Sequence, residues 1–164
     1  MINKPRLVYW DSCVFLSYVN GPEDRLQVIE TLWDEITESN GTIYTSVITL
    51  TEGAYASIER DRRIIDQGIE DKIDTMWEDA SVMVSELHPE IARIARGLMR
   101  SALPNSWILK PNDAIHLATA SWINNAVQPI SEIQTYDEDL KKYGPMIGIP
   151  ICEPHVLQAR LINR

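Results

Sequence analysis

The sequence predicts an α/β fold with a mostly parallel central sheet. Short apolar runs rich in β-branched and aromatic residues alternate with longer segments whose apolar residues recur at helical spacing. The 164 residues suit one domain of ordinary size, and the 45% hydrophobic content is enough for one core. The sequence contains no repeat and no linker-like tract. We therefore expect a single domain over residues 1–164.

Turn signals divide the chain into alternating elements. Gly21-Pro22 ends a short helix that Ser12 is expected to cap, and Asn40-Gly41 is typical of a turn. Pro150 cannot donate to a ladder, so the last strand is expected at an edge. The predicted strands are residues 6–10, 42–45, 82–84, 133–136 and 147–151, and the predicted helices are 23–38, 46–58, a charged stretch over 59–79, a segment from 89, 113–124 and 137–143.

Composition excludes several classes of protein. The chain has no run of about 20 apolar residues that would span a bilayer and no signal-peptide layout, so we expect a cytoplasmic protein without a membrane partner. The net charge of −9 argues against indiscriminate nucleic-acid binding but permits a nucleic-acid substrate. Cys13 and Cys152 lie too far apart for a metal-type pair, and the three histidines are too dispersed to suggest zinc.

Four acidic residues stand where predicted strands end or helices begin. Asp11 follows the first strand, and Asp137 follows Thr135-Tyr136 at the end of another. Asp113 opens a helix, and Glu52 lies in the helix after the second strand. Parallel strands bring their carboxyl ends to one edge of a sheet, where ligands bind. Carboxylates gathered there repel one another unless a cation is present, so the pattern indicates a metal site.

At these residues the chain resembles the PIN-domain nucleases, and among them the VapC-type toxins of toxin–antitoxin pairs. The resemblance covers about residues 7–151 and rests on four motifs in the family's order: Asp11-Ser12, the Ser46-to-Glu52 segment, Asp113-Ala114-Ile115-His116, and Thr135-Tyr136-Asp137. It implies a three-layer Rossmann-like sandwich with about five strands, hydrolysis of RNA, and one or two Mg²⁺ or Mn²⁺ ions bound by the four acidic residues. It also implies a homodimer and a cognate antitoxin, for which we expect an interface at the apolar positions of residues 64–77.

The predicted chemistry is in-line attack on a phosphodiester by metal-activated water. Mg²⁺ and Mn²⁺ are hard cations that prefer carboxylate oxygen to sulfur or imidazole. Asp11 and Asp113 are assigned as the central ligands, while Glu52 and Asp137 would hold a second ion or orient water. Asp139 is the substitute for Asp137, since Asp137 lies nearer the strand end.

Several neighbouring residues are candidates for supporting roles. The hydroxyls of Ser12, Ser46 and Thr135 suit contacts to the ligands or to phosphate. His116 lies one turn from Asp113, where it either touches a ligand carboxylate or is a hydrogen-bonded core histidine. Arg93, Arg96 and Arg100 form one helix face, either a solvated surface or a guide for RNA phosphates.

Each feature also has a purely structural interpretation. Asp11, Asp113 and Asp137 stand at positions where carboxylates cap helices or favour their N-termini. Two other functions remain open: a PIN nuclease for RNA processing without an antitoxin, and a catalytically silent PIN-like scaffold. A small DNA-binding gene upstream would favour the toxin.

Overall fold

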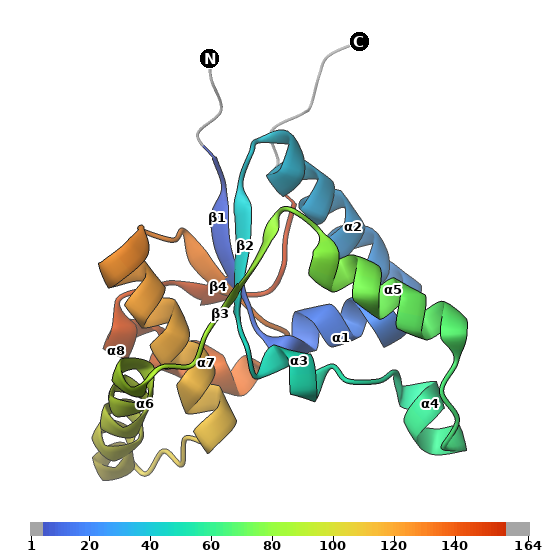
Figure 1. Ribbon diagram of the computed structural model, residues 1–164. Helices are drawn as coiled ribbons and strands as arrows, with labels where there is room; N and C mark the ends of the chain where they lie inside the picture. Colours follow the sequence, from blue (N-terminus) through green and yellow to red (C-terminus); the bar gives the residue numbers. More distant parts are fainter. Residues whose placement is uncertain (1–4, 157–164) are drawn as a thin grey trace.

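A computed structural model describes residues 5–156 of the chain (Figure 1). Its centre is one five-stranded sheet in the order β3-β2-β1-β4-β5, in which every neighbouring pair is parallel. This confirms the predicted α/β fold with a mostly parallel sheet of about five strands. The strands are β1 (Leu7–Trp10), β2 (Thr42–Ser46), β3 (Val82–Ser85), β4 (Glu132–Gln134) and β5 (Ile151–Cys152).

Helices cover both faces of the sheet, giving three layers (Figure 1). On one face lie α1 (Ser12–Asn20), α2 (Glu23–Glu38) and α5 (Gln67–Glu78), and on the other lie α6 (Pro89–Ala102) and α7 (Pro111–Trp122). No helix within residues 5–156 has both the length and the apolar character needed to cross a bilayer. The shorter elements are α3 (Thr49–Glu52), α4 (Ser57–Arg62), α8 (Gly144–Ile147), 3-10 turns at Leu103–Asn105 and Glu138–Tyr143, and a π-helical turn at Ile123–Val127.

The central strand β1 contributes to the cores on both faces. Val8 and Trp10 pack against α1, α2 and α5, whereas Tyr9 points to the core beneath α6 and α7. All three side chains are fully buried. Alternate residues of a strand point to opposite faces, so a strand covered on both sides must be apolar throughout, as this one is.

The topology reverses direction at β1, which positions the site. The chain passes from β1 to β2 and β3 on one side, then returns through α6 and α7 to β4 on the other side of β1. The carboxyl ends of β1, β2 and β4 therefore meet at one edge of the sheet. Such a switch point is where open α/β sheets bind ligands.

Two of the predicted helices are interrupted. The helix expected over 46–58 ends at Glu52, where Gly53 follows, and the stretch 59–79 is broken between α4 and α5. The buried Glu59 carboxylate is the physical reason, since it accepts the N–H groups of Ala56 at 2.9 Å and Asp66 at 2.8 Å, on either side of α4. These bonds satisfy donors that would otherwise require a continuous helix.

The last predicted strand is also shorter than expected. Residues 144–147 form α8 instead, and Gly148 ends it in the left-handed conformation at φ 69°. Only Ile151 and Cys152 pair with β4, at the edge of the sheet. The edge position of this strand is therefore confirmed, but its predicted bounds of 147–151 are wrong.

Gly41 allows the close approach that starts β2. A Cβ atom added there would lie 2.2 Å from the backbone oxygen of Arg6. That same oxygen accepts the Thr42 N–H at 2.9 Å in the pairing of β1 with β2. We expect Gly41→Ala to lower the free energy of unfolding by about 1–3 kcal/mol in urea titrations, because the backbone must shift.

Gly97 provides the matched control for this substitution. It lies in α6, and a Cβ there would meet no atom within 4 Å. Gly97→Ala is expected to stabilise the protein by about 0.5–1 kcal/mol, since alanine restricts the unfolded chain more than glycine does. Equal effects of the two substitutions would contradict this account of Gly41.

Candidate metal centre

Two of the four predicted carboxylates follow strands, and the other two lie on helices near the same carboxyl edge of the sheet. Asp11 directly follows β1, and Asp137 follows β4 after two residues. Glu52 is the last residue of α3, which follows β2, and Asp113 lies in the first turn of α7. Residues up to 126 positions apart in the sequence are thereby gathered in one region, and hydrogen bonds and electrostatic contacts connect them as described below.

Asp11 is the most buried of the four, with 5% of its surface exposed. Its Oδ2 accepts the Thr135 hydroxyl at 2.6 Å, and its Oδ1 accepts the Cys13 N–H at 3.1 Å and the Cys13 thiol at 2.7 Å. Asp11, rather than the expected Ser12, is therefore the N-cap of α1. Burial raises the pKa of Asp11, although the bonds from Cys13 and Thr135 act in the opposite direction.

Thr135 connects Asp11 to the loop that carries Asp137. The fully buried Thr135 hydroxyl donates to Asp11 and accepts the Asp137 N–H at 2.9 Å. Asp137 is exposed, and its Oδ1 accepts the Asp139 N–H at 2.9 Å, which caps the following 3-10 turn. Of the two alternatives, Asp137 is therefore the residue with an electrostatic effect on Asp113, whose pKa its charge raises.

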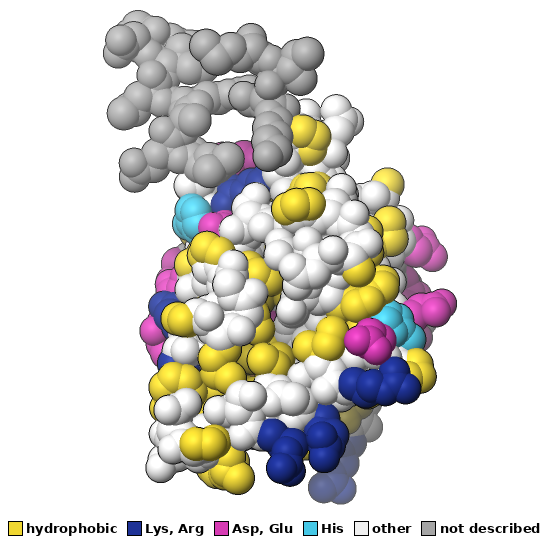
Figure 2. All heavy atoms as spheres, turned by 90° about the vertical axis from the view of Figure 1, so that its left-hand side faces the viewer, with side chains coloured by type: hydrophobic (Ala, Val, Ile, Leu, Met, Phe, Trp, Pro, Cys, Tyr) yellow, Lys and Arg dark blue, Asp and Glu magenta, His cyan; other side chains and the backbone are white. Residues whose placement is uncertain are grey.

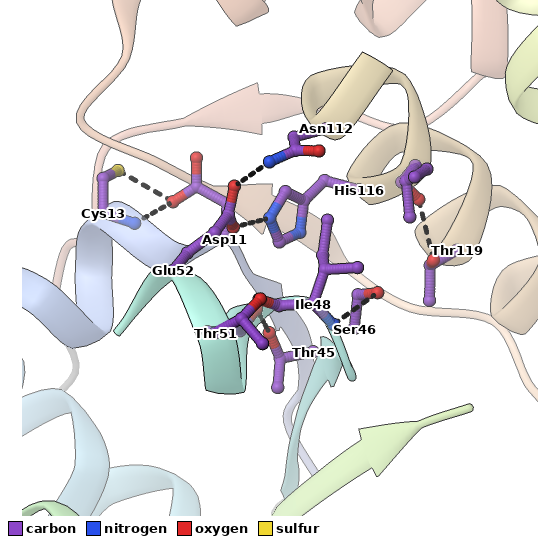
Figure 3. Close-up of polar contacts among 12 residues, drawn as sticks. Asp11, Cys13, Thr45, Ser46, Ile48, Thr51, Glu52, Asn112, His116 and Thr119 are labelled. Carbon is purple, nitrogen blue, oxygen red and sulfur yellow. Dashed lines mark hydrogen bonds and ion pairs between the residues drawn. The ribbon is translucent and has the colours of Figure 1, made fainter. Parts of the chain in front are cut away.

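Glu52 is fixed by side chains of α7 (Figure 3). Its Oε1 accepts the Asn112 amide at 3.0 Å, and its Oε2 lies 2.8 Å from His116 Nε2. Burial raises the pKa of Glu52, but the hydrogen bond and electrostatic effect of His116, with smaller contributions from bonds by Ser12 and Asn112, outweigh it and leave the pKa below its ordinary value. Glu52 is therefore an anion at neutral pH, with its orientation fixed from two sides.

Asp113 experiences the repulsion of two of the other carboxylates, Asp137 and Asp11. Burial is the largest cause of its raised pKa, and the negative charge of Asp137 is the second. Asp11 adds a smaller contribution of the same sign, while Lys110 and His116 act in the opposite direction. Crowded carboxylates of this kind gain stability from a divalent cation, which favours the charged form of each.

His116 connects this region to the core. The ring is 4% exposed, and its Nδ1 lies 2.8 Å from the hydroxyl of the fully buried Tyr9. Burial raises the pKa of Tyr9 well above its ordinary value, so the hydroxyl keeps its proton, and it also accepts a hydrogen bond from the Ser46 backbone. The Tyr9 proton is then free to bond Nδ1, which leaves the ring proton on Nε2, directed at Glu52. Both sequence interpretations of His116 hold together: it is a hydrogen-bonded core residue that also contacts a predicted ligand.

The remaining predicted residues divide into two groups. Ser12 contacts Glu52, whereas the buried Ser46 hydroxyl accepts the Ile48 N–H at 3.5 Å and so shapes the turn into α3.

The three predicted arginines, Arg93, Arg96 and Arg100, are exposed on α6. Figure 2 shows Lys and Arg side chains gathered along the lower edge of this face, beside hydrophobic side chains. Arg96 and Arg100 line a groove of about 410 Å³ that reaches Pro111, two residues before Asp113.

Sequence reasoning missed three residues of the site. Tyr9 was predicted only as part of a strand, and Cys13 was considered only as one of two distant cysteines, yet Cys13 is half-buried and bonded to Asp11. Asn112 was not among the predicted site residues, yet its amide bonds Glu52. Side-chain alternation along β1 was the available signal for Tyr9, because it places this residue on the face that α7 covers.

Comparison with known families agrees with this architecture. A sequence profile of the PIN domain matches residues 8–144, which is most of the chain. The chain therefore belongs to the PIN-domain family. A search of curated proteins found no matching relative.

Several solved structures share the fold at low sequence identity. VapBC2 of Rickettsia felis, bound to a promoter DNA fragment, is 14% identical, with a TM-score of 0.59 over 88% of this chain and 96% of the other. VapC20 of Mycobacterium tuberculosis, a toxin that cleaves the sarcin-ricin loop, is 14% identical, with a TM-score of 0.61 over 84% and 95%. FitAcB of Neisseria gonorrhoeae is 13% identical, with a TM-score of 0.59 over 90% and 97%.

The orientation of His116 can be tested without any metal. We expect ¹⁵N NMR of the metal-free protein to show His116 with its proton on Nε2. Tyr9→Phe removes the donor to Nδ1, so the Nδ1 resonance should shift while Glu52 keeps the proton on Nε2, and the free energy of unfolding should fall by about 1–3 kcal/mol. Tyr44→Phe is the control, because its hydroxyl bonds Gln128 and not the histidine. An unchanged Nδ1 resonance in Tyr9→Phe would refute the connection.

Proposed function

We propose that this protein is a Mg²⁺- or Mn²⁺-dependent endoribonuclease. The main support is the convergence of Asp11, Glu52, Asp113 and Asp137 at the switch point of a PIN fold. The donor set fits the ion, because these cations prefer carboxylate oxygens. The raised pKa of Asp113 has the same implication, since it reflects negative charge that a divalent cation would offset. Asp11 and Asp113 would be the central ligands, with Glu52 and Asp137 completing the site.

The protein side chains prepare this site in different ways. When bound, the cation would lower the pKa of a water molecule and neutralise charge on the scissile phosphate. Thr135 and Cys13 hold both oxygens of Asp11, and His116 and Asn112 hold both oxygens of Glu52. Ligands oriented in advance lose less freedom when a substrate binds. Asp137, exposed and held by fewer bonds, is the ligand best placed to adjust to RNA.

We further propose that the protein is the toxin of a type II toxin–antitoxin pair. The support is its similarity in fold to VapBC2 and to FitAcB. A groove of about 380 Å³ extends from Glu52 along α1 and α2 and includes Leu16, Arg25 and Tyr55. An antitoxin segment in this groove would block access to the acidic site. Among the positions expected for an interface over 64–77, Ile64 and Ile65 are exposed at 66% and 64%, whereas Ile73 and Met76 belong to the core.

A homodimer and a cytoplasmic location complete the proposal. Leu103 and Ile108, which follow α6, expose 61% and 76% of their surfaces. Covering such surface with a second copy would be favourable by the hydrophobic effect. The alternatives, an RNA-processing PIN nuclease without an antitoxin and a silent PIN-like scaffold, differ in whether RNA is cleaved and whether an antitoxin binds.

The central test is cleavage of total cellular RNA, mapped at nucleotide resolution, with Mg²⁺ or Mn²⁺ and with a chelator. Asp11→Asn and Asp113→Asn are expected to lower cleavage by at least about 100-fold, because each would lose a charged metal ligand. Asp137→Asn should also impair cleavage, whereas the matched change Asp139→Asn should leave it within about threefold. Cleavage that continues in the presence of the chelator would refute metal dependence. If no RNA is cleaved at any metal concentration, the proposed ribonuclease activity is refuted.

A second test concerns the arginines of α6. If Arg96 and Arg100 contact RNA phosphates, Arg96→Glu and Arg100→Glu should each raise KM. Each lost contact should also reduce, by about 0.7, the slope of the logarithm of the binding constant against the logarithm of the salt concentration on single-stranded RNA. Arg62→Glu on α4 makes the same charge change on an exposed residue of another element. If all three variants weaken binding equally, the effect comes from net charge and the groove has no special role.

A further inference from the structure

A second cluster of metal-ligating side chains lies on β4, on the edge strand β5 and just after β5. Glu132 begins β4, Cys152 ends β5, and His155 follows three residues later. One ligand atom from each lies within 4.8 Å of the others. Cys152 Sγ is 3.9 Å from His155 Nδ1, and Glu132 Oε1 is 3.7 Å from the other ring nitrogen, Nε2, so only one of these two distances applies to a given ion. Glu132 opens the strand that Thr135 and Asp137 follow, so this cluster is separate from the carboxylate site.

We propose that Glu132, Cys152 and His155 bind a Zn²⁺ ion. Thiolate and imidazole are softer ligands than carboxylate and select zinc over Mg²⁺. Zinc binds sulfur at about 2.3 Å and nitrogen or carboxylate oxygen at about 2.0–2.2 Å, so tetrahedral ligands lie roughly 3.3–3.6 Å apart. The three candidate ligand atoms lie within 4.8 Å of one another, so the side chains would have to close by up to about 1.5 Å around the ion. The spacing Cys152-Glu153-Pro154-His155 lets one short segment supply two of the three ligands.

Strand pairing positions these ligands. Cys152 pairs with Gln134, and Glu132 lies two residues before Gln134, so both side chains project from the same face. Arg6 Nη2 donates to the His155 carbonyl at 3.3 Å, which fixes the backbone of the third ligand. The Glu132 side chain is 16% exposed and that of His155 is 49% exposed, so solvent can reach a fourth position.

The neighbouring Arg6 is compatible with a cation. Its guanidinium lies 2.9 Å from Glu132 Oε1 and 3.6 Å from Glu35 Oε2, so carboxylates offset its positive charge. The bonds from Arg6 and from Gln134 both go to Glu132 Oε1, the oxygen that also faces His155, and they hold this carboxylate in place.

The properties of Cys152 do not suit a reactive or redox-active cysteine. Burial, followed by the negative charge of Glu132, raises the pKa of its thiol to about 12. Reactive cysteines instead have lowered pKa values and cationic surroundings. A metal that binds this sulfur displaces the proton, as thiolate ligation requires.

The test uses Co²⁺ as a spectroscopic probe on the untagged full chain, purified free of metal. We expect a thiolate-to-cobalt charge-transfer absorption that saturates at one Co²⁺ per chain and disappears when Zn²⁺ is added. Excess Mg²⁺ should leave it unchanged. Cys152→Ser, which is nearly isosteric, and His155→Ala should lose the band and weaken Zn²⁺ binding by more than about tenfold. Circular dichroism of both variants checks that they fold.

The other cysteine gives the matched control. Cys13 contacts Asp11, so a band arising at the carboxylate site would vanish in Cys13→Ser and survive in Cys152→Ser. That result, or no band with the unaltered protein, would overturn the zinc proposal. A band lost in Cys152→Ser but kept in Cys13→Ser and Asp11→Asn supports it. Neither outcome depends on RNA cleavage, so the zinc proposal stands or falls separately from the nuclease proposal.

Discussion

The parallel pairing of β1 with β2 on one side and with β4 on the other determines where the chain leaves the sheet. Val8 is aligned with Ile43 in β2 and with Glu132 in β4, so the three strands end at similar heights. Asp11 then emerges beside Thr135, and the hydroxyl of Thr135 can reach both Asp11 and the loop of Asp137. A slip of one residue in either pairing would turn every side chain of that strand to the other face. The acidic site thus depends on a register that the apolar cores on both faces enforce.

At the carboxyl edge of the sheet, one carboxylate can both cap a helix and remain available to a metal ion. Asp11 caps α1, and Asp137 caps the following 3-10 turn. Capping uses one oxygen of each carboxylate and aligns it with backbone N–H groups that stabilise its charge. A carboxylate that caps a helix at the sheet edge is therefore held in a fixed position while it keeps its negative charge. The structural interpretation of these residues, considered from the sequence as an alternative to metal binding, describes how they are held in position.

The sequence was informative where local pattern decides the structure. Strands and the positions of the four carboxylates followed from alternating apolar runs and from the residues at strand ends. Prediction from the sequence failed where a side chain outside the local pattern determines the structure. The buried Glu59 interrupts the expected helices by accepting the N–H groups of Ala56 and Asp66. Tyr9 and His116 are 107 residues apart, and no local signal pairs them. The histidines looked too dispersed for zinc because spacing along the chain does not show that β4 and β5 lie side by side.

The hydrogen bonds around the four carboxylates are unevenly distributed. Asp11 and Glu52 have bonded partners on both oxygens and connect, through Thr135 and His116, to fully or nearly fully buried side chains. Asp137 is exposed and faces solvent from a short turn. One side of the site is thus rigid and the other can adapt. Substitutions that change which RNA the site accepts should therefore occur mainly in the turn after β4. Substitutions on β1 and α7 should instead destabilise the fold.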